Sequence, residues 1–186
     1  MLEWPQMSGE RYFLEAWLSK GVHRSEQLEV EGVPHAHITF VRPFTILEGK
    51  EADVREKIAG YCKGKKPIPF TMEGEGNFDG KINHIPVDGV EIEEFDSGIE
   101  GLLENDVLFK EKLGEKKILH LTIETARSSP FPRTELFMLR LTCIRDKRVW
   151  FSFDFVTQEV LSREESLDGA RWVNTCNAFL EQGGSI

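Results

Sequence analysis

Hydrophobic and polar residues alternate along several stretches of the chain, with the period of two that is typical of half-buried β-strands. At residues 12–18, every second side chain, from Tyr12 to Leu18, is apolar and falls on one face. Residues 149–156 repeat the pattern, with phenylalanine at positions 151, 153 and 155. By the same reasoning, further strands are expected at residues 35–42, where Pro43 should end the strand, and at 68–78, 82–88, 117–124 and 135–144.

Apolar residues recur at helical spacing in three other stretches. The first predicted helix covers about residues 54–62, where apolar positions are separated by three and four residues. The second is expected at about 99–113. The third is a C-terminal helix at about 163–182, opened by Ser162 and Glu165, which resemble a capping box.

The order of these elements predicts the fold class. Seven strands with few helices favour an α+β fold over a doubly wound parallel sheet. A helix followed by a strand occurs twice, which suggests two similar halves. A chain of 186 residues buries about 70% of its unfolded surface and needs no disulfide or structural metal to stay folded. We therefore expect one domain that spans residues 1–186.

Charge and cysteine content narrow the possible partners. The chain has 23 Lys and Arg residues against 32 Asp and Glu residues, a net charge of -9, which disfavours binding along a long nucleic-acid duplex. No stretch has the roughly 18 apolar residues of a membrane helix, and the N-terminus lacks a signal-peptide pattern. Three widely separated cysteines without a C-x-x-C motif are typical of a reducing compartment. We expect a cytoplasmic monomer without membrane contact.

Two tetrapeptides of the form His-apolar-Thr-apolar carry the candidate chemistry. His37 begins the sequence His-Ile-Thr-Phe, and His120 begins His-Leu-Thr-Ile, each inside a predicted strand. Residues i and i+2 share a strand face, so His37 lies beside Thr39 and His120 beside Thr122, with apolar residues on the opposite faces. One such copy is most often half-exposed surface. Two copies favour a groove where two imidazoles and two hydroxyls converge.

Two imidazoles and two hydroxyls suit phosphodiester chemistry. Displacement at phosphorus needs a base on the attacking oxygen and an acid on the leaving oxygen. Histidine titrates near neutrality, so one ring can be neutral while the other is protonated. Hydroxyl groups can donate hydrogen bonds to the non-bridging phosphate oxygens.

These motifs resemble the paired signatures of the 2H phosphoesterase superfamily, which includes 2′-5′ RNA ligases and RNA cyclic phosphodiesterases. The likeness covers the chain from residue 11 to about residue 156 and omits the C-terminal 30 residues. The resemblance implies two antiparallel-sheet lobes related by a pseudo-two-fold axis around a central cleft.

The resemblance also implies an activity and its residues. It predicts metal-independent opening of a 2′,3′-cyclic phosphate or a related cyclic phosphodiester or 2′-5′ linkage, without a cofactor. His37 and His120 would be the acid/base pair, and Thr39 and Thr122 would hold the phosphate. The expected substrate is a small cyclic nucleotide or a short RNA end. Which histidine acts as the base stays open.

Two other functions compete with this one. The same cleft could bind an RNA end or a nucleotide without turnover, although a binding module has no need of both histidines. Alternatively, His35, His37 and His120 could ligate zinc in a hydrolase. The zinc hypothesis is less favoured, because His35 and His37 lie two apart on a strand with no acidic ligand nearby.

A few other residues are candidates for secondary roles, with packing or solvent exposure as the alternative for each. The aromatic residues that could stack on a base are Phe44, Phe78 and Phe131. Arg42 could reach a phosphate, although a surface salt bridge is the commoner role. His23 and His84 receive no predicted role. The basic cluster Lys63–Lys66 and the predicted hairpin turn Arg145–Arg148 could steer an anion if they border the cleft.

Overall fold

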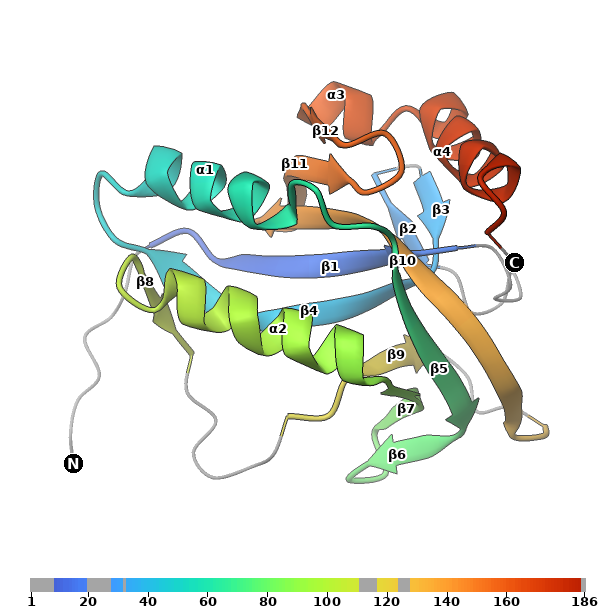
Figure 1. Cartoon of the computed structure of the whole chain (residues 1–186). Helices are drawn as coiled ribbons and strands as arrows, with labels where there is room; N and C mark the ends of the chain where they lie inside the picture. The colour runs from blue at the N-terminus through green and yellow to red at the C-terminus, as the bar shows by residue number, and fades with distance from the viewer. Residues whose placement is uncertain (1–8, 20–27, 32, 111–116, 124–127, 185–186) are drawn as a thin grey trace.

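The fold is a mixed α+β structure in which a mostly antiparallel sheet curls into a half-barrel (Figure 1). The computed structural model describes residues 9–19, 28–31, 33–110, 117–123 and 128–184. This architecture confirms the predicted α+β class and its antiparallel character. None of the helices in these ranges is long and apolar enough to cross a membrane.

Twelve strands and four helices occur in the described part of the chain. The strands are β1 (Tyr12–Leu18), β2 (Leu28–Val30), β3 (Val33–His35), β4 (His37–Ile46), β5 (Ile68–Gly74), β6 (Gly76–Phe78), β7 (Ile82–Asp88), β8 (Val107–Phe109), β9 (His120–Ile123), β10 (Phe131–Arg145), β11 (Arg148–Asp154) and β12 (Glu159–Leu161). The helices are α1 (Glu51–Cys62), α2 (Val90–Leu103), α3 (Arg163–Ser166) and α4 (Gly169–Glu181).

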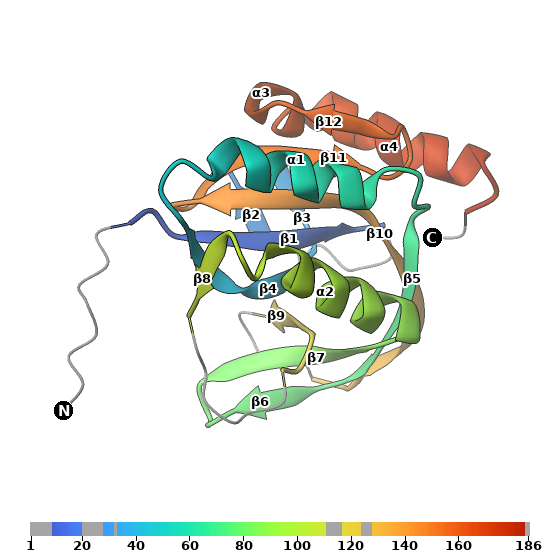
Figure 2. The ribbon, with the colours of Figure 1, turned by 60° about the vertical axis from the view of Figure 1, so that its left-hand side comes forward.

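The long strand β10 joins the two parts of the sheet. Its N-terminal part pairs with β5, and its C-terminal part pairs with β1 and β11. The main strand order is β6-β7-β5-β10-β1-β4-β8, with β9 on β7 and β12 on β11. Strands β2 and β3 form a separate hairpin. As a result, β4 and β9 belong to opposite arms of one curled sheet (Figure 2).

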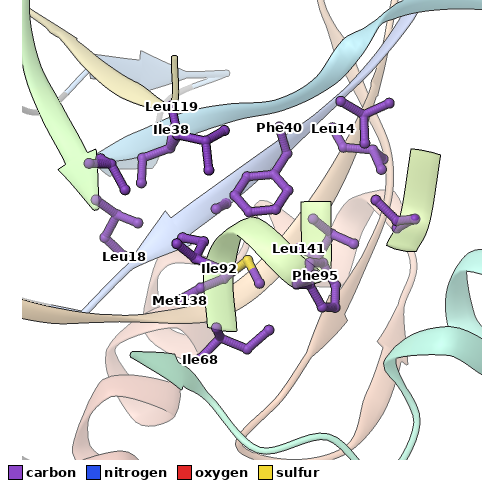
Figure 3. Packing of buried hydrophobic residues seen from close by; sticks show 14 of the residues in the cluster. Leu14, Leu18, Ile38, Phe40, Ile68, Ile92, Phe95, Leu119, Met138 and Leu141 are labelled. Atoms are coloured by element: carbon purple, nitrogen blue, oxygen red, sulfur yellow. The ribbon is translucent and has the colours of Figure 1, made fainter. Parts of the chain in front are cut away.

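Helices α1 and α2 cover one face of the sheet and enclose the main core. The close-up in Figure 3 shows Phe40 of β4 among Ile92 and Phe95 of α2 and Leu141 of β10. The predicted apolar stripe of α1 is confirmed, because Val54, Ile58 and Cys62 are fully buried. Removing the apolar side chains of α1 and α2 from water supplies the main driving force for packing both helices on the sheet.

The second predicted helix, at residues 99–113, is displaced in the structure. Helix α2 lies earlier, because Ile92 and Phe95 extend the apolar stripe of Ile99 toward the N-terminus. The chain then forms β8, whose three residues add a strand to the edge of β4. The predicted helical continuation beyond residue 103 is therefore wrong up to residue 110, and residues 111–113 lie outside the described part.

Strand β4 does not end at Pro43 as expected. Leu14 faces Phe40, whereas Tyr12 faces Phe44, so the chain between Phe40 and Phe44 is too long for its partner strand and forms a bulge. A bulge tolerates proline, whose missing N–H cannot join the ladder. The predicted strand 35–42 is also divided at Ala36, since β3 ends before it and β4 begins after it.

Turn chemistry explains two other element boundaries. Gly74 has a φ of 79° and ends β5, and β6 begins at Gly76, so the predicted strand 68–78 is two strands. The predicted hairpin between β10 and β11 is confirmed. Asp146 and Lys147 have φ values of 45° and 66°, which suit a two-residue turn whose twist matches the flanking strands.

The C-terminal region forms two helices in place of the predicted single one. The capping box at Ser162 and Glu165 is confirmed and opens the short helix α3. The chain then turns, and the Asp168 side chain accepts hydrogen bonds from the first backbone amides of α4. Helix α4 packs on the sheet face opposite α1 and α2, where Trp172 meets Trp17 of β1.

Candidate active site

The two His-x-Thr motifs lie on neighbouring strands of the curled sheet. His37 begins β4, and His120 begins β9. Figures 1 and 2 both place β9 next to β4, and the two strands approach closely although they share no ladder. The fold therefore brings together two motifs that are far apart in the sequence.

Each motif has the two faces that its pattern predicts. Ile38, Phe40, Leu121 and Ile123 are buried in the main core. Thr39 and Thr122 are exposed, and the two histidines are partly exposed. Ile38 and Leu119, which directly precedes His120, belong to the same apolar cluster (Figure 3). Packing in the core thus fixes both strands through their apolar faces and leaves the threonines on the opposite faces exposed to solvent.

A buried carboxylate accompanies His37. Glu15 lies directly opposite Thr39 on β1 and is only 4% exposed. Its Oε1 is 3.4 Å from Nε2 of His37, and its Oε2 accepts a hydrogen bond of 3.4 Å from the Trp17 indole N–H. An opposite charge at this distance favours the protonated imidazole. Glu15 was not among the predicted site residues, although a carboxylate between Leu14 and Ala16 on an otherwise apolar strand was a usable signal.

His120 has a different environment. Its Nδ1 is 2.8 Å from the backbone carbonyl oxygen of Ile118. Because a carbonyl oxygen can only accept, this hydrogen bond assigns the proton of the neutral ring to Nδ1 and leaves a lone pair on Nε2. The two candidate histidines are therefore chemically unequal: His37 is next to a carboxylate, and His120 is held by a carbonyl.

Two aromatic rings pack against His120. Phe78 and His84 stack with centroids 3.9 Å apart and planes 10° apart. Both lie edge-on to His120, with centroid distances of 4.9 Å for Phe78 and 5.2 Å for His84. A Cβ atom on Gly76 would lie 2.4 Å from Nε2 of His84, so glycine makes room for that ring. This cluster supports one side of the His120 imidazole.

His84 is the second residue that sequence analysis missed. It lies opposite Thr122 in the β7–β9 ladder and is buried, with no hydrogen-bond partner for Nδ1 in the described part of the chain. Its sequence context gave no signal, because the strand pairing that brings it to Thr122 is a tertiary feature. The stack with His84 also occupies one face of Phe78, so at most the other face could receive a base.

The remaining secondary candidates lie in ordinary structural settings. Phe44 stacks on Tyr12 inside the core, and Phe131 is also buried, which leaves neither ring available to a base. Arg42, inside β4, forms a salt bridge in which its Nε is 3.9 Å from Oε1 of Glu100. Residue 23 and the side chain of residue 35 lie outside the described part of the structure.

The two basic clusters, and the residues that line two surface hollows, are distant in the sequence from the His-x-Thr motifs. Lys65 and Lys66 border two hollows of about 480 and 390 Å³ beside the loop after α1. Neither hollow is lined by a His-x-Thr residue. Arg145 pairs with Glu10 at 2.5 Å. The two hollows are therefore separate from the candidate site.

The described part of the chain contains neither a candidate metal-ligand cluster nor, at Cys62 and Cys143, a reactive thiol. Within the described ranges, no group of three or more His, Cys, Asp or Glu side chains could hold a metal ion. Burial raises the pKa of the Cys62 thiol to about 12, and it also raises the pKa of Cys143. These two thiols remain protonated at neutral pH and are poor nucleophiles.

Comparison with models of known protein families and with curated protein sequences gave no match for this chain.

Proposed function

We propose that this protein is a metal-independent phosphoesterase of the 2H type, which opens a 2′,3′-cyclic phosphate or a related cyclic phosphodiester or 2′-5′ linkage. One observation carries the proposal: two His-x-Thr tetrapeptides lie on neighbouring strands, each with an apolar face in the core and an exposed threonine. We also propose that the two arms of the sheet are the two lobes, related by a pseudo-two-fold axis, with β4 and β9 as equivalent strands.

The unequal surroundings of the histidines support distinct roles. We assign His120 as the base, because the Ile118 carbonyl leaves the lone pair on Nε2. We assign His37 as the acid, because Glu15 favours its protonated ring. Water attacks phosphorus and gives its proton to His120, while the leaving ribose oxygen takes a proton from His37. The bond from phosphorus to that oxygen breaks, and the product is a phosphomonoester.

The threonines would hold the phosphate during this reaction. Thr39 and Thr122 lie two residues after each histidine on the same strand faces and are exposed. Their hydroxyls can donate to the non-bridging oxygens, where negative charge must be held. The net charge of -9 favours a small cyclic nucleotide or a short RNA end over a long duplex.

Binding without turnover is the second candidate. It is favoured by the 3.4 Å distance between Nε2 of His37 and Glu15, because a nitrogen directed at a carboxylate must reorient to reach a leaving group. In that case the two motifs would recognise a phosphate but transfer no proton.

A turnover panel distinguishes the two functions. The purified chain is incubated with 2′,3′-cyclic nucleotides, cyclic-ended short RNA, an ADP-ribose cyclic phosphate and a 2′-5′ dinucleotide, and the product isomer is identified. The proposal expects hydrolysis of at least one substrate with a single product isomer. Saturable binding without any product would support the binding module instead.

Glu15→Gln should lower kcat/KM and shift its pH dependence. Without the carboxylate, His37 should lose its proton at a lower pH, so the alkaline limb of the profile should move to lower pH while the acidic limb stays. The profile is measured from pH 5 to 9, with Glu135→Gln on β10 as a control at an exposed position. An unchanged alkaline limb would contradict the role of His37 as the acid.

Chelation should leave turnover intact. The proposed reaction uses imidazoles for proton transfer and hydroxyls to hold the phosphate, so incubation with excess EDTA followed by gel filtration should change kcat by less than about twofold. Activity lost on chelation and restored by zinc or manganese would instead support the zinc hydrolase, with His37 and His120 among its ligands.

A further inference from the structure

A buried carboxylate of helix α2 links β4 to the segment that leads into β9. Asp96 is 6% exposed and lies on the core side of the sheet. Its Oδ1 accepts a hydrogen bond of 3.0 Å from the backbone N–H of Val41 in β4. Both carboxylate oxygens also accept from the Lys117 ammonium, at 2.6 and 2.7 Å. One side chain therefore contacts the segments that carry both histidines.

The contacts of Asp96 fall close to the motifs along the chain. Val41 comes two residues after Thr39, and Lys117 comes three residues before His120. The two strands share no backbone ladder in the described part of the chain. Apolar packing alone is not directional. The hydrogen bonds of Asp96 therefore add a directional link between β4 and the segment that leads into β9.

The backbone at Val41 needs this link. Val41 is buried with a φ of 43°, in the left-handed region that a β-branched residue rarely adopts. It lies in the bulge of β4, and its N–H is directed to Asp96. A buried amide without an acceptor is unfavourable. The Asp96 carboxylate therefore compensates for the strained conformation just after the first motif.

Glu100, one turn further along α2, reinforces the arrangement. Its Oε1 accepts from the Lys117 ammonium at 3.2 Å and from the backbone N–H of Arg42 at 3.4 Å. Each of the two acidic residues thus contacts β4 and Lys117. We call the Asp96–Lys117 pair, together with the Val41 amide that it holds, the strand clamp.

We infer that Asp96 is a positioning residue that holds β4 and β9 at the separation and register needed for the histidines to act on one phosphate. This inference rests on the proposed function, because it assigns Asp96 a role in that reaction. A displacement of about 1 Å can reduce the rate of an oriented reaction by roughly 10²-fold. Loosening the clamp should therefore lower kcat more than it raises KM.

The test compares charge removal at two positions of the same helix. Asp96→Asn keeps the size of the side chain but weakens its bond to Lys117, whereas Glu93→Gln removes an exposed carboxylate of α2. We expect Asp96→Asn to lower kcat by about 10- to 100-fold with little change in KM, and Glu93→Gln to behave as wild type. Lys117→Met provides the same test if Asp96→Asn fails to fold, and Lys117→Arg should retain most of kcat.

Hydrogen–deuterium exchange supplies a measurement that does not depend on activity. In Asp96→Asn or Lys117→Met, the amides of residues 37–46 and 117–123 should both exchange faster, while those of β11 stay protected. Unchanged exchange together with unchanged kcat would overturn the strand clamp. Faster exchange in both segments, with a wild-type protein inactive on the substrate panel, would retain the clamp and reject the phosphoesterase proposal.

Discussion

His37→Ala and His120→Ala should each reduce the turnover of a 2′,3′-cyclic phosphate by about 10²–10⁴-fold, the usual contribution of one positioned acid or base. Both rings are partly exposed, and their strands are held by apolar residues on the opposite face. The substitutions should therefore leave the fold intact. Initial rates measure the effect, and circular dichroism and a thermal melt verify folding.

The double variant provides a sharper measurement. Residues that act as one unit have non-additive effects, so His37→Ala/His120→Ala should be only slightly slower than either single variant. Losses that multiply would indicate independent roles in binding. A single variant with near-wild-type turnover would show that the acid/base assignment is wrong.

The sequence pattern predicted the faces of the motif strands because strand periodicity is a local property. Ile38 and Leu121 are buried, whereas Thr39 and Thr122 are exposed, as alternation requires. The α+β class followed from the same periodicity. The periodicity alone could not place the two His-x-Thr motifs on neighbouring strands, because the pairing of distant segments cannot be derived from either segment alone. That expectation came from the family resemblance.

Other features of the site depend on tertiary contacts and could not be predicted. His84 meets His120 only because β7 pairs with β9. The continuation of β4 beyond Pro43 depends on a bulge that contains the strained residue Val41. The backbone N–H of Val41 donates a hydrogen bond to Asp96 of α2, 55 positions later in the chain. Sequence propensity would place neither a valine at positive φ nor a strand through proline.

Arg140 of β10 forms a buried ion pair with Asp154 of β11, and the same guanidinium donates hydrogen bonds to α3 and α4, which lie outside the reach of the family resemblance. Arg140 is fully buried beside the Trp17 and Trp172 rings, with its guanidinium carbon 5.5 and 4.9 Å from their centroids. Its Nη2 donates to Asp154 at 3.1 Å, and Nη1 donates to the Ser166 carbonyl of α3 at 3.2 Å. Burial lowers the pKa of Arg140, and Asp154 opposes this effect.

Arg140→Met should therefore reduce the free energy of unfolding by about 3–5 kcal/mol, because it leaves the Asp154 carboxylate buried without its countercharge. Urea denaturation measures the loss. Arg133→Met is a matched control on the same strand, because its bridge to Glu73 is exposed and contributes little. Equal effects of the two variants would show that the buried pair contributes no more to stability than the exposed pair.

Removing the second charge separates the ion pair from the packing around it. In Arg140→Met/Asp154→Asn, no uncompensated charge remains, so part of the lost stability should return. Trp17, which packs against Arg140, also donates to the Glu15 carboxylate beside His37. If Arg140→Met also lowers kcat, recovery of stability in the double variant without recovery of kcat would mean that the orientation of Trp17 by Arg140 matters to the site. An unchanged kcat in both variants would confine the role of Arg140 to stability.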